Sequence, residues 1–185
     1  MGAEVVRVFL TIITLISPER GGLSHEESCR MLTISEAIVG TEHENTRYTD
    51  LISLAFHESR FGINYEPEEQ IVSPAGACGI YQQIPRYSEP SNLAKPTCEG
   101  LQDAWEASYR AVNFLEVLNN RYGNLESAMC HYCGGYRCSP ICQEYRDKHI
   151  RIKRRVERIY SRTLSVNFDL AVAFGRLINF CAIYR

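Results

Sequence analysis

Apolar residues recur at helical spacing along most of this 185-residue chain. The clearest case lies within residues 50–60. There Leu51, Leu54, Ala55 and Glu58 occupy positions i, i+3, i+4 and i+7, so they share one face of a helix. Three of these four residues are apolar, which predicts that this face packs against a core. The fourth is an acid, and it stands out for that reason.

The same periodicity, with capping signals, predicts further helices. Thr33 and Glu36 have the S/T-x-x-E spacing of a capping box, which predicts a short helix that starts there and runs toward Gly40. The expected helices are 5–16, 33–40, 50–60, 103–119, 125–133, one that starts at Ser139-Pro140, and 168–184. Gly62 is expected to close the third, while Asn124 caps the fifth and Gly134-Gly135 close it. The apolar face of 103–119 consists of Trp105, Tyr109, Val112 and Leu115, and that of the helix after Ser139-Pro140 consists of Ile141, Tyr145, Ile152, Val156 and Ile159.

Residues 62–100 interrupt this helical pattern. The stretch is rich in proline and glycine, which predicts a loop-rich lobe with short strands around 70–72 and 79–83. We find no internal repeat and no linker. The chain therefore reads as one mainly helical domain over residues 33–162, preceded by an apolar lead-in, 1–32, and followed by an amphipathic helix, 163–185, packed on the domain or anchoring it.

Composition excludes disordered and fibrous proteins, since 45% of residues are hydrophobic and 23% are charged. The net charge of −2 predicts no general affinity for nucleic acid. Residues 146–162 are an exception, because they hold eight basic residues against two acidic ones. This run is either a solvated helix face or a surface that attracts an anionic cell-wall polymer, membrane lipid or packaged nucleic acid.

The N-terminal apolar run, 5–16, is interrupted by Arg7 and is too short to span a bilayer. It is also a poor signal peptide, because Glu4 stands where a basic cluster is usual and no small-x-small cleavage site precedes Pro18. We interpret it as a buried first helix or a docking segment, with an uncleaved membrane-contacting segment as the alternative.

The chain has eight cysteines, and four of them form a C-x2-C-x4-C-x3-C cluster over residues 130–142. Disulfides of an oxidising compartment, free buried thiols and a zinc site all remain open, although a single tight cluster lacks the two separated knuckles usual for zinc. Cys78 and Cys98 bracket the loop-rich lobe. We expect them to lie close enough for a disulfide.

Glu58 is misplaced by ordinary rules, since an acid on an apolar face is costly unless it is paired or protonated. Burial raises the pKa of a carboxyl group, and a carboxyl that stays protonated near neutral pH can act as a general acid. The alternative is an acid at a helix end that reaches solvent or pairs with Arg60 or His57.

The surrounding motifs favour the first interpretation. Residues 57–61 read HESRF, residues 73–85 read SPAGACGIYQQIP, residues 131–135 read HYCGG, and residues 144–145 read EY. This order resembles the soluble lytic transglycosylase family, whose motifs are E-S-x-F, S-x-x-G-A-x-G-L-M-Q-x-x-P, A-Y-N-x-G and a later tyrosine. The resemblance covers about residues 33–160. It implies an α+β lysozyme-like fold, in which a helical domain with a catalytic helix and a small loop- and β-rich lobe form a cleft.

The resemblance also implies site residues. Glu58 matches the single catalytic acid, and seven further residues match positions that contact the substrate: Ser59, Gly76, Gly79, Tyr81, Gln82, Tyr132 and Tyr145. The chain departs from the pattern at three positions. Cys133 replaces the asparagine of A-Y-N-x-G and cannot supply an amide, His131 replaces a small residue, and Tyr81 replaces a methionine.

The implied reaction is cleavage of the bond between N-acetylmuramic acid and N-acetylglucosamine in peptidoglycan strands, with 1,6-anhydro ends and no metal or cofactor. Residues 73–85 contain no acid, and the nearby Glu66, Glu68 and Glu69 lie in a polar run expected to be a solvated loop. A muramidase or a peptidoglycan endopeptidase on the same fold is an alternative. Another is a degenerate structural component of a virion or secretion apparatus. The weak export signal favours a phage virion, or release into the host periplasm and cell wall.

Overall fold

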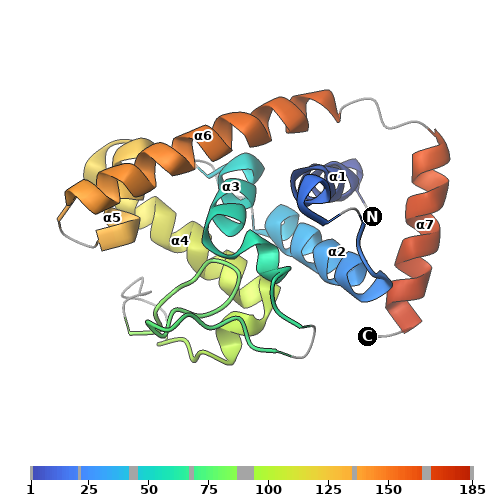
Figure 1. Cartoon of the computed structure of the whole chain (residues 1–185), viewed down its shortest axis with the longest axis horizontal. Helices are drawn as coiled ribbons and strands as arrows, with labels where there is room; N and C mark the ends of the chain where they lie inside the picture. The colour runs from blue at the N-terminus through green and yellow to red at the C-terminus, as the bar shows by residue number, and fades with distance from the viewer. Residues whose placement is uncertain are drawn as a thin grey trace.

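The computed structural model describes residues 2–20, 22–41, 46–66, 69–86, 94–134, 137–163 and 168–183. Helices dominate these residues (Figure 1), as the periodicity predicts. The elements are α1 (Ala3–Arg20), α2 (His25–Gly40), α3 (Tyr48–Ser59), η1 (Arg60–Gly62), η2 (Gly100–Gln102), α4 (Ala104–Tyr122), α5 (Leu125–Gly134), α6 (Pro140–Arg162) and α7 (Phe168–Ile183).

The expectation of a buried first helix is confirmed. Val8, Ile12 and Leu15 of α1 are fully buried and belong to one hydrophobic core with residues of α2, α3, α4 and α6. Arg7, which interrupts the apolar run, donates from Nε to the carbonyl oxygen of Tyr160 at 3.0 Å and stacks over the Tyr160 ring. Among the described residues, no helix is long and apolar enough to cross a membrane.

The predicted start of α2 is wrong. The helix begins eight residues before Thr33, because Ser24 and Glu27 form a capping box of their own. The Ser24 hydroxyl accepts from the backbone N–H of Glu27 at 3.1 Å, and the Glu27 carboxylate accepts from the backbone N–H of Ser24 at 2.7 Å. Thr33 lies inside the helix, where its hydroxyl donates to the carbonyl oxygen of Cys29.

Helix α3 ends one residue before the predicted end at Arg60, and Gly62 does not cap it. Its last residue is Ser59, and the next two residues, Arg60 and Phe61, take left-handed backbone angles with φ of 52° and 60°. Such angles are costly for residues with a side chain and need support from the surrounding structure. The Phe61 side chain gives that support, since it is fully buried in the core.

The lobe between α3 and α4 is confirmed as a loop-rich region, but its predicted strands are absent from the described residues. Only isolated bridges form there, Val72 with Cys78 and Cys78 with Gln83. The predicted disulfide between Cys78 and Cys98 is present, with a Cα–Cα distance of 5.5 Å. A disulfide and a few bridges, in place of sheet pairing, hold this lobe together.

The capping signals at Asn124 and Ser139 are confirmed, whereas Gly134 lies inside α5 and Gly135 lies outside the described residues. Two of the predicted apolar faces are partly wrong. Ser139 caps α6, with Pro140 as its first residue. Trp105 and Tyr109 of α4 are 45% and 47% exposed, and Ile141 of α6 is 76% exposed. The Trp105 ring packs close to Gly40, since a Cβ at Gly40 would lie 2.3 Å from Cζ3 of that ring. Tyr145 of the α6 stripe binds Glu58. The remaining residues of the predicted faces do pack in or against the core: Val112, Leu115, Ile152, Val156 and Ile159.

Two further disulfides cross the helical part. Cys29–Cys181 joins α7 to α2, and Cys130–Cys138 closes the α5–α6 turn. Cys133 and Cys142 are free thiols. No group of His, Cys, Asp and Glu side chains suited to a metal ion occurs within the described part of the chain, so the zinc alternative gains no support there. In Figure 1, α6 runs across α3 and α5, while α7 stands at the far end beside α2.

Candidate functional site

Glu58 lies in the last turn of α3, where its side chain is partly buried against α6. The hydroxyl of Tyr145, from the second turn of α6, donates a hydrogen bond to Oε1 of Glu58. Two residues that are 87 positions apart in the sequence therefore meet at one carboxyl group, and both were predicted as site residues.

The environment of Glu58 favours its protonated form. Burial raises its pKa to about 7, whereas the Tyr145 hydrogen bond and the positive charge of Lys148 act in the opposite direction. Removal from water is the larger effect, because the carboxylate loses its hydration and gains only one hydrogen bond and one nearby cation. Near neutral pH, Glu58 can therefore both donate and accept a proton.

The described carboxylates near the start of the lobe lie in an exposed turn. Glu66 and Glu69 are exposed, and the Glu69 carboxylate accepts from the backbone N–H of Glu66 at 3.3 Å, within a single turn. Glu68 lies outside the described residues. The predicted solvated loop is thus confirmed for Glu66 and Glu69, and neither carries the features of a second catalytic acid.

Ser59 connects the acid to the glycine-rich turn. Its hydroxyl is buried and donates to the carbonyl oxygen of Ile80 at 2.8 Å. Gly79 has a φ of 71°, and a Cβ there would lie 1.9 Å from the carbonyl oxygen of Leu101, so only glycine fits. By contrast Gly76, with φ of 77°, is exposed and has open space around it.

Gln82 closes this turn in a left-handed conformation with φ of 48°. Its side-chain Nε2 and its backbone N–H both donate to the carbonyl oxygen of Gly79, each at 3.0 Å. The Gln82 side chain is partly buried. Together with Arg60 and Phe61, it makes a group of left-handed non-glycine residues on the two segments joined by Ser59, a type of strain that gathers at functional sites.

Tyr81 does not line the surface of the site. Its side chain is fully buried, and its hydroxyl pairs with that of Ser108 at 3.1 Å. Tyr132 reaches the same turn from α5, since its hydroxyl donates to the carbonyl oxygen of Tyr81 at 2.8 Å. Burial raises the pKa of the Tyr132 hydroxyl well above its usual value, and the charge of Glu58 adds to this effect. Tyr81 thus supports the turn from inside, and Tyr132 holds it near Glu58.

The sequence pattern did not indicate two neighbouring imidazoles next to this site, the partly buried His57 and the buried His149. The His57 ring stacks on the Tyr145 ring with centroids 4.3 Å apart, and it lies 5.7 Å from the ring of His149. Burial is the main cause that lowers the pKa of His57 to about 4 and that of His149 to about 3, so both are neutral at pH 7. His149 follows Tyr145 by one helical turn, and this spacing could have indicated that both face α3.

The departures from the family motif also have defined places. Cys133 is exposed, and burial, together with the neighbouring thiol of Cys142, raises the pKa of Cys133. The charge of Glu58 contributes in the same direction. His131 stacks on the Tyr122 ring at 3.5 Å and so contributes to packing between α4 and α5.

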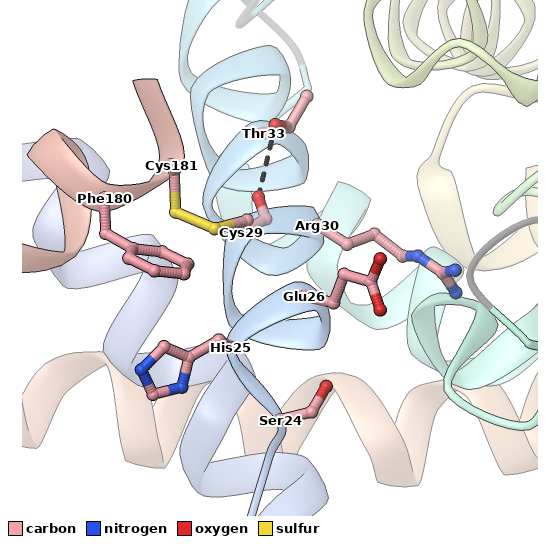
Figure 2. A pocket seen from close by; sticks show the side chains of 8 residues that line it. All are labelled: Ser24, His25, Glu26, Cys29, Arg30, Thr33, Phe180 and Cys181. Carbon is pink, nitrogen blue, oxygen red and sulfur yellow. Dashed lines mark hydrogen bonds between the residues drawn. A yellow bond between two sulfur atoms is a disulfide. The ribbon is translucent and has the colours of Figure 1, made fainter. Parts of the chain in front are cut away.

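Two surface hollows lie away from Glu58. One is lined by Arg154, Glu157, Arg158 and Ser161 on α6. The other, of about 600 Å³, lies where α7 meets the start of α2. Figure 2 shows Phe180 and Cys181 of α7 facing His25 and Cys29 of α2 in this second hollow. The predicted cleft beside Glu58 stays a prediction.

Comparison with known proteins adds no relative. No protein-family model matches the chain, and neither a curated protein nor a solved structure is significantly similar to it. The functional evidence is therefore the geometry around Glu58. Tyr145 of α6 binds its carboxyl group, and hydrogen bonds from Ser59 of α3 and Tyr132 of α5 hold the glycine-rich turn.

Proposed function

We propose that this protein is a peptidoglycan lytic transglycosylase with Glu58 as its catalytic acid and base. The observation that carries the proposal is the Tyr145 hydrogen bond to a partly buried Glu58 whose pKa is raised to about 7. The links from Ser59 to Ile80 and from Tyr132 to Tyr81 support it, because they join the segments that resemble the family's motifs.

In the proposed reaction, protonated Glu58 donates its proton to the glycosidic oxygen between N-acetylmuramic acid and N-acetylglucosamine. The C1–O bond breaks, and the substrate's own acetamido group stabilises the positive charge that develops at C1. The Glu58 carboxylate then removes the proton from the C6 hydroxyl of the same muramyl residue, whose oxygen bonds to C1. The product is a 1,6-anhydro ring, and Glu58 is protonated again.

A single acid suffices for this route because the nucleophile belongs to the reacting sugar. A tethered hydroxyl has a high effective concentration and competes with water. A muramidase would instead need a second carboxylate to activate water or attack C1. The exposed positions of Glu66 and Glu69 favour the transglycosylase over the muramidase.

The proposed setting is the bacterial envelope, reached from a phage particle or through a lysis system, with glycan strands as the binding partner. Three disulfides support an oxidising compartment such as the periplasm or a cell surface. Cys133, in place of the family's asparagine, is the feature that favours a degenerate binding component of a virion or secretion apparatus.

Tyr145→Phe is expected to shift the pH dependence of activity upward. The lost hydrogen bond is one of two effects that lower the pKa of Glu58, so its removal lets the pKa rise further above 7. The alkaline limb of the kcat/KM profile, where the acid loses its proton, should move by up to about one pH unit. The measurement is the pH profile of sacculus digestion by both proteins, and an alkaline limb that stays in place or moves to lower pH would contradict the assignment.

The proposal itself is tested by digestion of purified sacculi with the full chain. Release of soluble disaccharide-peptides would support glycan-strand cleavage. Opening of peptide cross-links with intact strands would assign the site to an endopeptidase. Binding without any cleavage would assign the chain to the degenerate binding class.

A further inference from the structure

One face of α6 carries a continuous row of basic side chains. Lys148, Arg151, Arg154, Arg158 and Arg162 are exposed, and Arg155 beside them is partly buried. At 100° per residue these six positions fall within an arc of about 120°, and they extend over about 21 Å of the helix. We call these six residues the basic face.

No described carboxylate forms an ion pair with a residue of the basic face, although Glu157 lies beside Arg154 and Arg158 in the surface hollow on α6. The ion pairs of α6 within the described structure join Arg146 to Asp147 and Lys153 to Asp50, and none of these four residues belongs to the basic face. Like charges three or four residues apart on a helix repel each other, and the basic face contains several such pairs. An arrangement that weakens an isolated helix in this way suits a surface that meets an anionic partner.

The basic face starts beside the candidate site. Tyr145, which binds Glu58, lies one turn before Lys148 on the same helix. The charge of Lys148 acts on both Glu58 and His57. A polymer that occupies the site is therefore within reach of the first charge of the row.

The chemistry of α6 restricts the kind of polyanion. Its aromatic residues are occupied, because Tyr145 binds Glu58 and the Tyr160 hydroxyl donates to Glu4 at 2.5 Å, so no described aromatic of α6 is free to stack on a nucleobase. Its exposed large apolar residue, Ile141, lies in the first turn, before the basic face begins. The isoleucines that flank the row, Ile152 and Ile159, pack against the core, which leaves little apolar surface beside the row to enter a membrane. These features favour a water-exposed polymer with charges at intervals.

We propose that the basic face binds the carboxylates of the peptide stems that project from peptidoglycan strands. This inference rests on the proposed function and adds a second contact to it, which holds the strand through its stems while Glu58 acts on the sugar. Each exposed ion pair is weak alone, so the binding comes from several pairs together and depends on salt.

The test compares two triple variants in a Glu58→Gln background, which binds sacculi without digesting them. One variant carries R151Q, R154Q and R158Q on the basic face. The control carries R47Q, R137Q and R176Q, which remove the same charge from exposed positions outside α6. At low ionic strength the basic-face variant should bind sacculi at least about tenfold more weakly than the parent, and the control by less than about threefold. At about 0.5 M salt the three proteins should converge.

A parallel measurement needs no substitution. Amidation of the sacculus carboxylates should weaken binding of the parent to the level of the basic-face variant, and neutral chitin oligomers should bind all three proteins equally. Equal binding by both triple variants, or no effect of amidation, would overturn the proposal. So would a larger loss of binding to duplex DNA or to anionic phosphatidylglycerol vesicles than to sacculi. If the Glu58→Gln protein binds the stems but the protein with Glu58 intact does not digest sacculi, the proposed function is refuted and the stem-binding proposal stands.

Discussion

Glu58→Gln is expected to lower the rate of sacculus digestion by about 10²- to 10⁴-fold, the usual contribution of a general acid–base group. The amide keeps the size of the side chain and its oxygen still accepts from Tyr145, but it cannot transfer a proton. Turbidity loss of purified sacculi measures the effect. Glu66→Gln and Glu69→Gln make the same change at exposed carboxylates and should retain activity close to that of the parent.

The same variant should be more stable than the parent at alkaline pH. The carboxyl pKa is 4.5 in the unfolded chain and about 7 in the folded one, so between these values the folded state binds more protons and stability falls as the pH rises. Glu58→Gln removes this cost, which reaches up to about 3 kcal/mol above pH 7. Urea unfolding should show the difference at pH 8 and little at pH 4. An inactive variant that is less stable at pH 8 would indicate a structural role for Glu58.

Removal of the Cys29–Cys181 disulfide should produce the largest loss of stability. The bond closes a loop with a sequence separation of 152 residues. In the chain-entropy model, its loss raises the entropy of the unfolded chain and lowers the free energy of unfolding by about 5 kcal/mol. The double variant Cys29→Ser/Cys181→Ser tests this by urea unfolding at pH 7.

The matched control is Cys78→Ser/Cys98→Ser, which opens a loop with a separation of 20 residues and should cost about 3 kcal/mol. The order of the two losses follows from loop length alone. A larger loss for the shorter loop would contradict the entropic explanation and point to native contacts in the lobe.

Local signals in the sequence predicted local structure well. The periodicity of Leu51, Leu54 and Ala55 located α3, and Ser139-Pro140 located the start of α6, because both depend on residues within a few turns. The predicted start of α2 was wrong because it also rested on a local pattern alone. Ser24-x-x-Glu27 and Thr33-x-x-Glu36 have the same spacing, and neither local pattern contains the packing that decides between them.

Contacts between residues far apart in the sequence could not be predicted from local periodicity. The pairing of Cys29 with Cys181 depends on where α7 lies, and the burial of His149 depends on α6 packing against α3. The contact of Trp105 with Gly40 joins residues that lie 65 positions apart in the sequence, so no local pattern contains it. At the site, motif order predicted both Glu58 and Tyr145 as site residues, and the structure brings them into contact. The same motifs also included Tyr81, whose side chain belongs to the core.

The identity of the muramyl ends that the protein releases tests the central claim most directly. Mass spectrometry of muropeptides from digested sacculi distinguishes 1,6-anhydromuramyl ends from reducing ends, which carry one additional water. If Glu58 acts alone as acid and then as base, anhydro ends should dominate and should disappear with Glu58→Gln. Digestion that depends on Glu58 but yields mainly reducing ends would contradict the single-acid mechanism and require a second group that activates water.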